Sequence, residues 1–204
     1  MPTVLDNIEG EVYRRFIEEA INRSTSFMLV NRTDFAYFQH ELYPAAYENP
    51  AYMEGAKRLR QDHNNNFRIY QENCEPFVKK LEPFLRYTRH DPIWPNCETI
   101  MTPDERSIDI CMYRACKEVI PYLLEPGTIF SWIYPYFPDD LSFFKDDICW
   151  FHTVSHEELA FLHTDSEKEV GFWESIGIEF SDKFDYDWDV NGRFNEAEHY
   201  PKQK

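Results

Sequence analysis

Glycine, long apolar runs and a leader-like N-terminus are scarce or missing in this chain of 204 residues. Only 6 residues are Gly against 13 Pro, and neither a G-x-G-x-x-G string nor a P-loop string occurs, which excludes the common glycine-rich nucleotide cradles. There is no run of about 18 apolar residues, so we expect no segment that spans a membrane. The first residues carry no basic start followed by an apolar stretch, so we also expect no secretory signal peptide.

Paired cysteines are also missing. The chain has five cysteines, an odd number, and none of them forms a C-x-x-C pair: Cys74, Cys97, Cys111, Cys116 and Cys149. Each has apolar or aromatic neighbours, which is typical of reduced thiols in the core of a cytoplasmic protein. The spacing argues against a zinc–thiolate site, and we expect no cofactor.

Positive charge is scarce as well. The chain has 21 Lys and Arg against 37 Asp and Glu, a formal net charge of −16, which would repel the phosphate backbone of a nucleic acid. Residues 139–204 hold 17 acids and 6 bases. The only locally basic stretch is residues 57–89, with eight bases and four acids. This stretch is either a solvated helix face or a patch for an acidic partner or for the protein's own tail.

Bulky apolar residues are plentiful, and their spacing predicts helices and strands. Hydrophobic residues make up 43% of the chain and aromatic residues 17%, enough for a substantial core. A helix is expected to about Asn22, with Asp6 and Glu9 as its capping box, followed by a strand at Ser26–Val30. Residues 31–91 are expected to be mostly helical. Strands are predicted at 106–114, 140–145, 148–154, 159–165 and 178–180, and a helix is predicted between Ser166 and Gly177.

This order of elements has no regular βαβ spacing. It predicts a single α+β domain over residues 1–180, with a mainly antiparallel sheet, packed helices and a helical N-terminal half. Residues 181–204 are expected to form an acidic, aromatic C-terminal tail.

Histidines gather around a predicted hairpin. If Ser155–Glu158 is its loop, one face of the two strands holds Trp150, His152, Val154, Leu159, Phe161 and His163. His152 and His163 would lie on a diagonal of that face, with His156 and Glu157 in the loop. A metal site or a general base is one interpretation, which makes His152, His156, Glu157 and His163 candidate catalytic residues. The other interpretation is histidine packing on an aromatic sheet face.

The tail contains a match to a calcium-binding loop. Residues 187–198, DWDVNGRFNEAE, fit the pattern D-x-[DN]-x-[DN]-G-x5-E. The candidate ligands are Asp187, Asp189, Asn191, the Arg193 carbonyl and Glu198. The flanking sequence is too short for two full helices, and no second loop is available to pair with this one.

The same tail alternates acids with aromatic rings. In an extended strand, carboxylates would lie on one face and rings on the other, a surface that suits a basic partner. The candidate partner-binding residues are Asp182, Phe184, Asp185, Tyr186, Asp187, Trp188 and Asp189. The alternative is that the tail folds back on the basic stretch at residues 57–89.

Residues 128–180 contain a string that follows W-x-x-P-x-x-P-[DE]-D-L-x-F-[FL]-K and then W-[FL]-x-[ST]-[VI]-x-H-E. The matching residues are Trp132, Pro135, Pro138, Asp139, Asp140, Leu141, Phe143, Phe144, Lys145, Trp150, Phe151, Thr153, Val154, His156 and Glu157. The string resembles a family of bacterial proteins often labelled as related to stage III sporulation protein AH. The resemblance implies that residues 32–75 are an insertion, which we predict to be mostly helical. It implies no reaction, but it implies that Asp139, Asp140, His156 and Glu157 belong to a shared scaffold, as turn caps or as a site.

Three classes of function remain. The composition favours a cytoplasmic protein-binding or inhibitory protein, of the immunity type that neutralises a basic toxin or enzyme. The alternatives are a calcium-binding module at residues 187–198 and an enzyme that uses the histidines of the hairpin. The expected partner is a basic protein, and neither a nucleic acid nor a membrane is expected.

Overall fold

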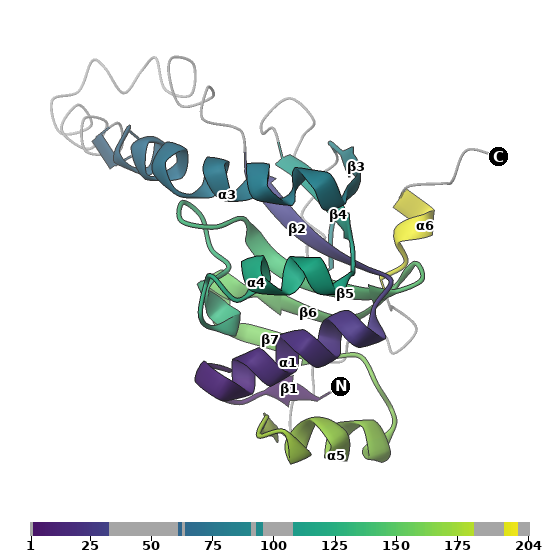
Figure 1. Cartoon of the computed structure of the whole chain (residues 1–204). Coiled ribbons are helices and arrows are strands. Elements are labelled where there is room, and N and C mark those ends of the chain that lie inside the picture. The colour runs from purple at the N-terminus through teal and green to yellow at the C-terminus, as the bar shows by residue number, and fades with distance from the viewer. Residues whose placement is uncertain are drawn as a thin grey trace, which may run out of the picture.

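The computed structural model describes residues 2–32, 61–62, 64–90, 93–95, 108–181 and 194–199 (Figure 1). Residues 64–72 are helical. The helices are α1 (Gly10–Arg23), α3 (Cys74–Leu81), α4 (Ile120–Leu123), α5 (Glu167–Ser175) and α6 (Glu196–His199). The strands are β1 (Thr3–Val4), β2 (Ser26–Arg32), β3 (Leu85–Arg89), β4 (Ile108–Arg114), β5 (Asp139–Lys145), β6 (Ile148–Val154), β7 (Leu159–Leu162) and β8 (Phe180–Ser181).

The eight strands form one sheet in the order β3-β4-β2-β5-β6-β7-β1-β8, and every neighbouring pair is antiparallel. The strand nearest the N-terminus, β1, therefore lies between β7 and β8, which come from the far end of the chain. The predicted α+β domain with a mainly antiparallel sheet is confirmed.

Helices cover one side of the sheet, which we call the helical face. Figure 1 shows α1 and α4 lying across this side, with α5 below α1. The buried residues of α1 are spaced three and four apart, as expected for one stripe of an amphipathic helix: Tyr13, Phe16, Ile17, Ala20 and Ile21. They join one core cluster with residues of β2, β5 and β6, among them Phe27, Phe143 and Phe151.

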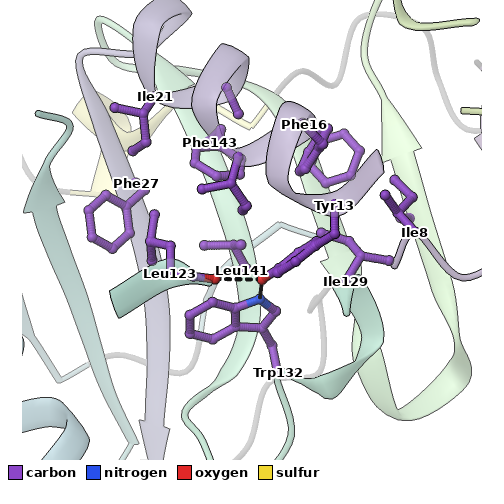
Figure 2. Packing of buried hydrophobic residues seen from close by; sticks show 14 of the residues in the cluster. Ile8, Tyr13, Phe16, Ile21, Phe27, Leu123, Ile129, Trp132, Leu141 and Phe143 are labelled. Carbon is purple, nitrogen blue, oxygen red and sulfur yellow. Dashed lines mark hydrogen bonds between the residues drawn. The ribbon is translucent and has the colours of Figure 1, made fainter. Parts of the chain in front are cut away.

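A short chain of hydrogen bonds lies inside this core (Figure 2). The Tyr13 hydroxyl donates to the Leu123 carbonyl at 2.7 Å, and the Trp132 indole N–H donates to the Tyr13 oxygen at 3.1 Å. Burial raises the pKa of Tyr13 above its ordinary value of 10.0, so the hydroxyl remains protonated and able to donate. The bonds tie α1 to α4 and to the segment before β5 at a depth that water does not reach.

The other side of the sheet is also buried, and we call it the tail face. Its buried apolar cluster comprises Met28, Val30, Trp94, Ile108, Ile110, Met112, Phe144 and Cys149, with Tyr87 and Phe194 packed against it. Residues 194–199 attach here, because the Cys149 N–H donates to the Phe194 carbonyl at 3.0 Å. The buried Glu196 carboxylate accepts from Arg89 at 2.8 and 3.0 Å. The C-terminal segment thus folds back on the last residue of the basic stretch.

Several local predictions are confirmed and others are wrong. The Ser166 hydroxyl accepts from the Glu169 N–H at 3.3 Å, as the capping box of α5 predicts. The capping box at Asp6 is wrong, because the N-cap of α1 is Glu9, which makes no side-chain cap. Residues 85–89 form β3 instead of continuing the helical region.

Among the described residues, no helix is long and apolar enough to cross a membrane. Most of the predicted insertion at residues 32–75, and residues 182–193 of the predicted tail, lie outside the described residues.

We predict that Tyr13→Phe lowers the free energy of unfolding by about 2–4 kcal/mol, because it leaves a buried indole N–H and a buried carbonyl without their partner. Urea denaturation followed by tryptophan fluorescence measures the change. Tyr136→Phe is the matched control, since Tyr136 is 52% exposed, and its effect should stay within about 0.5 kcal/mol. Equal stability of the two variants would contradict the role given to this hydroxyl.

Candidate functional site

One row of side chains crosses the tail face from edge to edge. Directly opposite residues in an antiparallel pair point to the same side of the sheet, so the strand register defines the row. It consists of Tyr87, Met112, Met28, Ser142, His152, Phe161, Thr3 and Ser181. Polar groups occupy its middle and its β8 end, beside the apolar cluster.

A β-bulge in β6 brings Cys149 to the same side as His152. Phe143 lies opposite Phe151 and Phe144 lies opposite Cys149, so Trp150 is an extra residue in β6. The Trp150 and Phe151 rings therefore both point to the helical face, where their centroids lie 5.8 and 6.3 Å from that of Phe143. The expectation that Trp150 shares a face with His152 is wrong for this reason.

The two histidines of the hairpin form a direct pair. Val154 pairs with Leu159 and His152 pairs with Phe161, which confirms the predicted register. His152 Nδ1 lies 2.7 Å from His163 Nε2, so one nitrogen donates and the other accepts. Burial, and then the charge of His163, lowers the pKa of His152 well below its ordinary 6.5, so His152 is neutral at neutral pH.

Cys149, His152 and His163 form a group that could hold a metal ion, since one ligand atom from each lies within 4.8 Å of the other two. Cys149 and His152 are fully buried, and His163 is half-buried. Sequence reasoning missed Cys149 because strict alternation places it on the opposite side from His152. The sequence pattern that could have indicated Cys149 is a C-x-x-H spacing in which both intervening residues are aromatic.

Two buried hydroxyls near this group make no hydrogen bond to any of the described residues: Ser142 Oγ and Thr3 Oγ1. Ser142 lies directly opposite His152, and Thr3 lies opposite Phe161, the next residue along the row. A buried hydroxyl without a partner costs about 1–3 kcal/mol. The polar part of the row therefore has hydrogen-bonding capacity that the described residues do not use.

The structure does not bring all the candidate catalytic residues together. His156 and Glu157 lie in the single 3₁₀ turn Ser155–Glu157, with His156 Nε2 3.7 Å from Glu157 Oε1 and both side chains 57% exposed. His152 lies within β6 and His163 is the residue that follows β7, so both lie outside the loop. The exposed loop and the buried pair are separate features.

Asp139 and Asp140 accept hydrogen bonds from the N–H groups of neighbouring turns. Asp139 accepts from the Tyr134 N–H at 2.6 Å and pairs with Arg32. Asp140 has a positive φ of 53° and accepts from the Ser155 N–H at 2.9 Å and from the Trp94 indole at 3.0 Å. Of the two interpretations of this pair, the contacts favour turn caps.

A second feature is a concentration of exposed carboxylates at the β7-β1-β8 edge, which we call the acidic edge. Over residues 5–9 and 156–179, all of them described, the chain has eight exposed acids and one base, Lys168. The acids are Asp6, Glu9, Glu157, Glu158, Asp165, Glu167, Glu174 and Glu179. The Leu5 N–H donates to the Glu179 carbonyl at 2.9 Å, so the two distant segments are joined here.

The candidate calcium and partner residues lie mostly outside the described residues: Asp182, Phe184, Asp185, Tyr186, Asp187, Trp188, Asp189, Asn191 and Arg193. Glu198 is the exception. It is exposed, lies within α6 and accepts from the Asn195 amide at 3.2 Å.

Comparison of the chain with protein-family models, with curated proteins and with solved structures found no match. Two features of the described residues, the His–Cys group and the acidic edge, have chemistry that points to a function.

We predict that Asp140 makes the stability depend on pH. Burial is the main cause that raises the pKa of Asp140 from 3.8 to about 6, so between about pH 4 and 6 the folded protein binds a proton that the unfolded chain has released. Its stabilising contribution is therefore complete below pH 4 and is lost as the pH rises through 6. Relative to Asp140→Asn, the native protein should gain about 2–3 kcal/mol between pH 7 and pH 4.

Urea denaturation at several pH values measures this difference. Asn tolerates the positive φ at residue 140. Asp146→Asn is the matched control, because Asp146 has a similar φ of 56° but is exposed, and its curve should run parallel to that of the native protein. A parallel curve for Asp140→Asn would show that Asp140 does not titrate in this range.

Proposed function

We propose that this protein binds and inhibits a basic protein, and that the acidic edge is the surface that meets it. The observation that carries the proposal is that the segments around β1, β7 and β8, which come from opposite ends of the chain and pair in the sheet, carry eight exposed acids against one lysine. A concentrated field of one sign speeds the association of an oppositely charged partner and excludes partners of like charge.

An exposed apolar side chain lies within the acidic edge. Leu5 is 56% exposed, although its neighbour Val4 is buried. Glu179 is bonded to it through the backbone, and Asp6 follows it in the chain. An apolar contact inside a charged rim is the usual arrangement of a protein–protein interface, where the rim sets orientation and the apolar group contributes contact area.

The sheet gives this surface a fixed shape. Its carboxylates are carried by residues next to β1, β7 and β8 and by α5, and Phe16 of α1 packs against Trp173 of α5 at a centroid distance of 5.5 Å. A rigid, preorganised surface loses little entropy on binding, which favours tight inhibition. Inhibition of a basic toxin or enzyme in the cytoplasm, as an immunity protein does, is the role that we propose. The acidic, aromatic tail is proposed as a second contact region.

The test compares two triple variants that remove the same charge. Asp6→Asn, Glu157→Gln and Glu179→Gln together change the acidic edge, whereas Glu72→Gln, Glu82→Gln and Glu118→Gln change exposed acids elsewhere. Each protein is used to capture partners from a lysate of the source cells at low salt. We expect a basic protein that the native chain and the control triple retain, and that the edge triple binds about tenfold more weakly or worse.

The captured protein is then purified and measured directly. Its association rate with the native chain should fall as salt is raised, and co-expression with the native chain should suppress its activity more strongly than co-expression with the edge triple. Equal binding by the two triple variants would overturn the assignment of the surface. A partner that is acidic, or that is bound but not inhibited, would overturn the proposed function.

A further inference from the structure

We propose that Cys149, His152 and His163 form a binding site for a zinc-type divalent cation on the tail face of the sheet. The three side chains come from β6 and from the residue that follows β7, and their ligand atoms lie within 4.8 Å of one another. The site is independent of the acidic edge and of the partner proposed for it.

The backbone of the hairpin brings the three proposed ligands together. His152 and His163 lie on a diagonal of one hairpin, and the β-bulge at Trp150 turns Cys149 to their side. The aromatic rings of Trp150 and Phe151 against Phe143 hold that bulge in place. The positions of Cys149 and His152 are therefore set by strand β6, and His163 follows directly on the neighbouring strand.

The histidine pair would have to open to admit the ion. Two imidazole nitrogens bound to one tetrahedral Zn²⁺ at about 2.0–2.1 Å lie about 3.3 Å apart, whereas His152 Nδ1 and His163 Nε2 are 2.7 Å apart. The pair therefore has to open by about 0.6 Å. His163 lies just beyond the end of β7 and is half-buried, so it is the ligand that can shift. An ion would enter the site from the side of His163, which is the only one of the three ligands that is partly exposed.

The protonation states suit a divalent ion. A neutral imidazole is the form that binds a metal. One of the two facing nitrogens carries the proton of the present hydrogen bond, so metal binding would require that ring to take its other tautomer, with the N–H on the nitrogen that does not face the ion. Cys149 donates its S–H to the Phe151 carbonyl at 3.3 Å, and on metal binding that proton leaves to solvent. Thiolate and imidazole are both donors that zinc accepts, and a tetrahedral ion held by these three residues would have a fourth position left for water.

The unused hydroxyls supply an independent observation. Ser142 is fully buried opposite His152, and its Oγ has no hydrogen-bond partner within the described part of the chain. Directly opposite side chains in a sheet lie within reach of one another. A water molecule on the metal's fourth position would donate to this oxygen, so the metal site would satisfy a buried group that is otherwise unpaired.

The experiment titrates the reduced full-length chain with Co²⁺, which takes the place of Zn²⁺ and is visible by absorption. We expect one equivalent to bind with a thiolate-to-cobalt charge-transfer band and the intense visible bands of a four-coordinate ion, and we expect Zn²⁺ to abolish both. Cys149→Ser should remove the charge-transfer band. His163→Gln should weaken binding by more than about 100-fold, since even the loss of an outer partner costs 10–100-fold.

Cys116→Ser is the matched control. Cys116 is a half-buried thiol outside the group, so this variant should bind Co²⁺ as the native protein does, with the same spectrum. His163 is only half-buried, so His163→Gln keeps the test valid even if Cys149→Ser fails to fold. Lack of saturable binding, or binding that survives His163→Gln with an unchanged spectrum, would overturn the site.

Discussion

Burial on both faces is the constraint on which the rest of this structure depends. In β2 and β5, six of the seven residues of each strand are buried, so side chains on either side of the sheet are removed from water. A polar group in such a place costs free energy unless it finds a partner inside the protein. Three pairs of side chains satisfy polar groups in this way: Arg89 with Glu196, Trp94 with Asp140, and His152 with His163.

Strand β6 links the two features that carry the functional argument. Its bulged middle presents Cys149 and His152 to the tail face, and its final residue leads into the turn that carries Glu157 and Glu158. The neighbouring strands β5 and β7 hold β6 along most of its length. One fixed backbone therefore supports a buried polar group and an exposed charged surface with different chemistry, and neither requires the other.

Local patterns in the sequence predict much of this fold. The position and length of the loop Ser155–Glu158 determine the hairpin register, and Ser166 and Glu169 cap α5 as their spacing predicts. Features that depend on contacts between distant parts of the chain could not be predicted. The bulge at Trp150 depends on how two rings pack against Phe143. Strand β3 is a charged edge strand, so its residues give only a weak local signal. Any carboxylate of the tail could have paired with Arg89. The acidic edge was equally hidden, because it joins segments that only the sheet order brings together.

The position of β1 determines the order in which the sheet can be assembled. Strands β5, β6 and β7 are neighbours in sequence, joined by short turns, and their contacts close small loops at low entropic cost. β1 pairs with β7 and β8, so it can join the sheet only after β7, which ends at Leu162, has been synthesised, and β8 can be added only later. Within the described strands, β8 is attached to the sheet through β1 alone. Such high contact order slows folding, and it makes the β1–β8 edge the last part of the sheet to form on a growing chain.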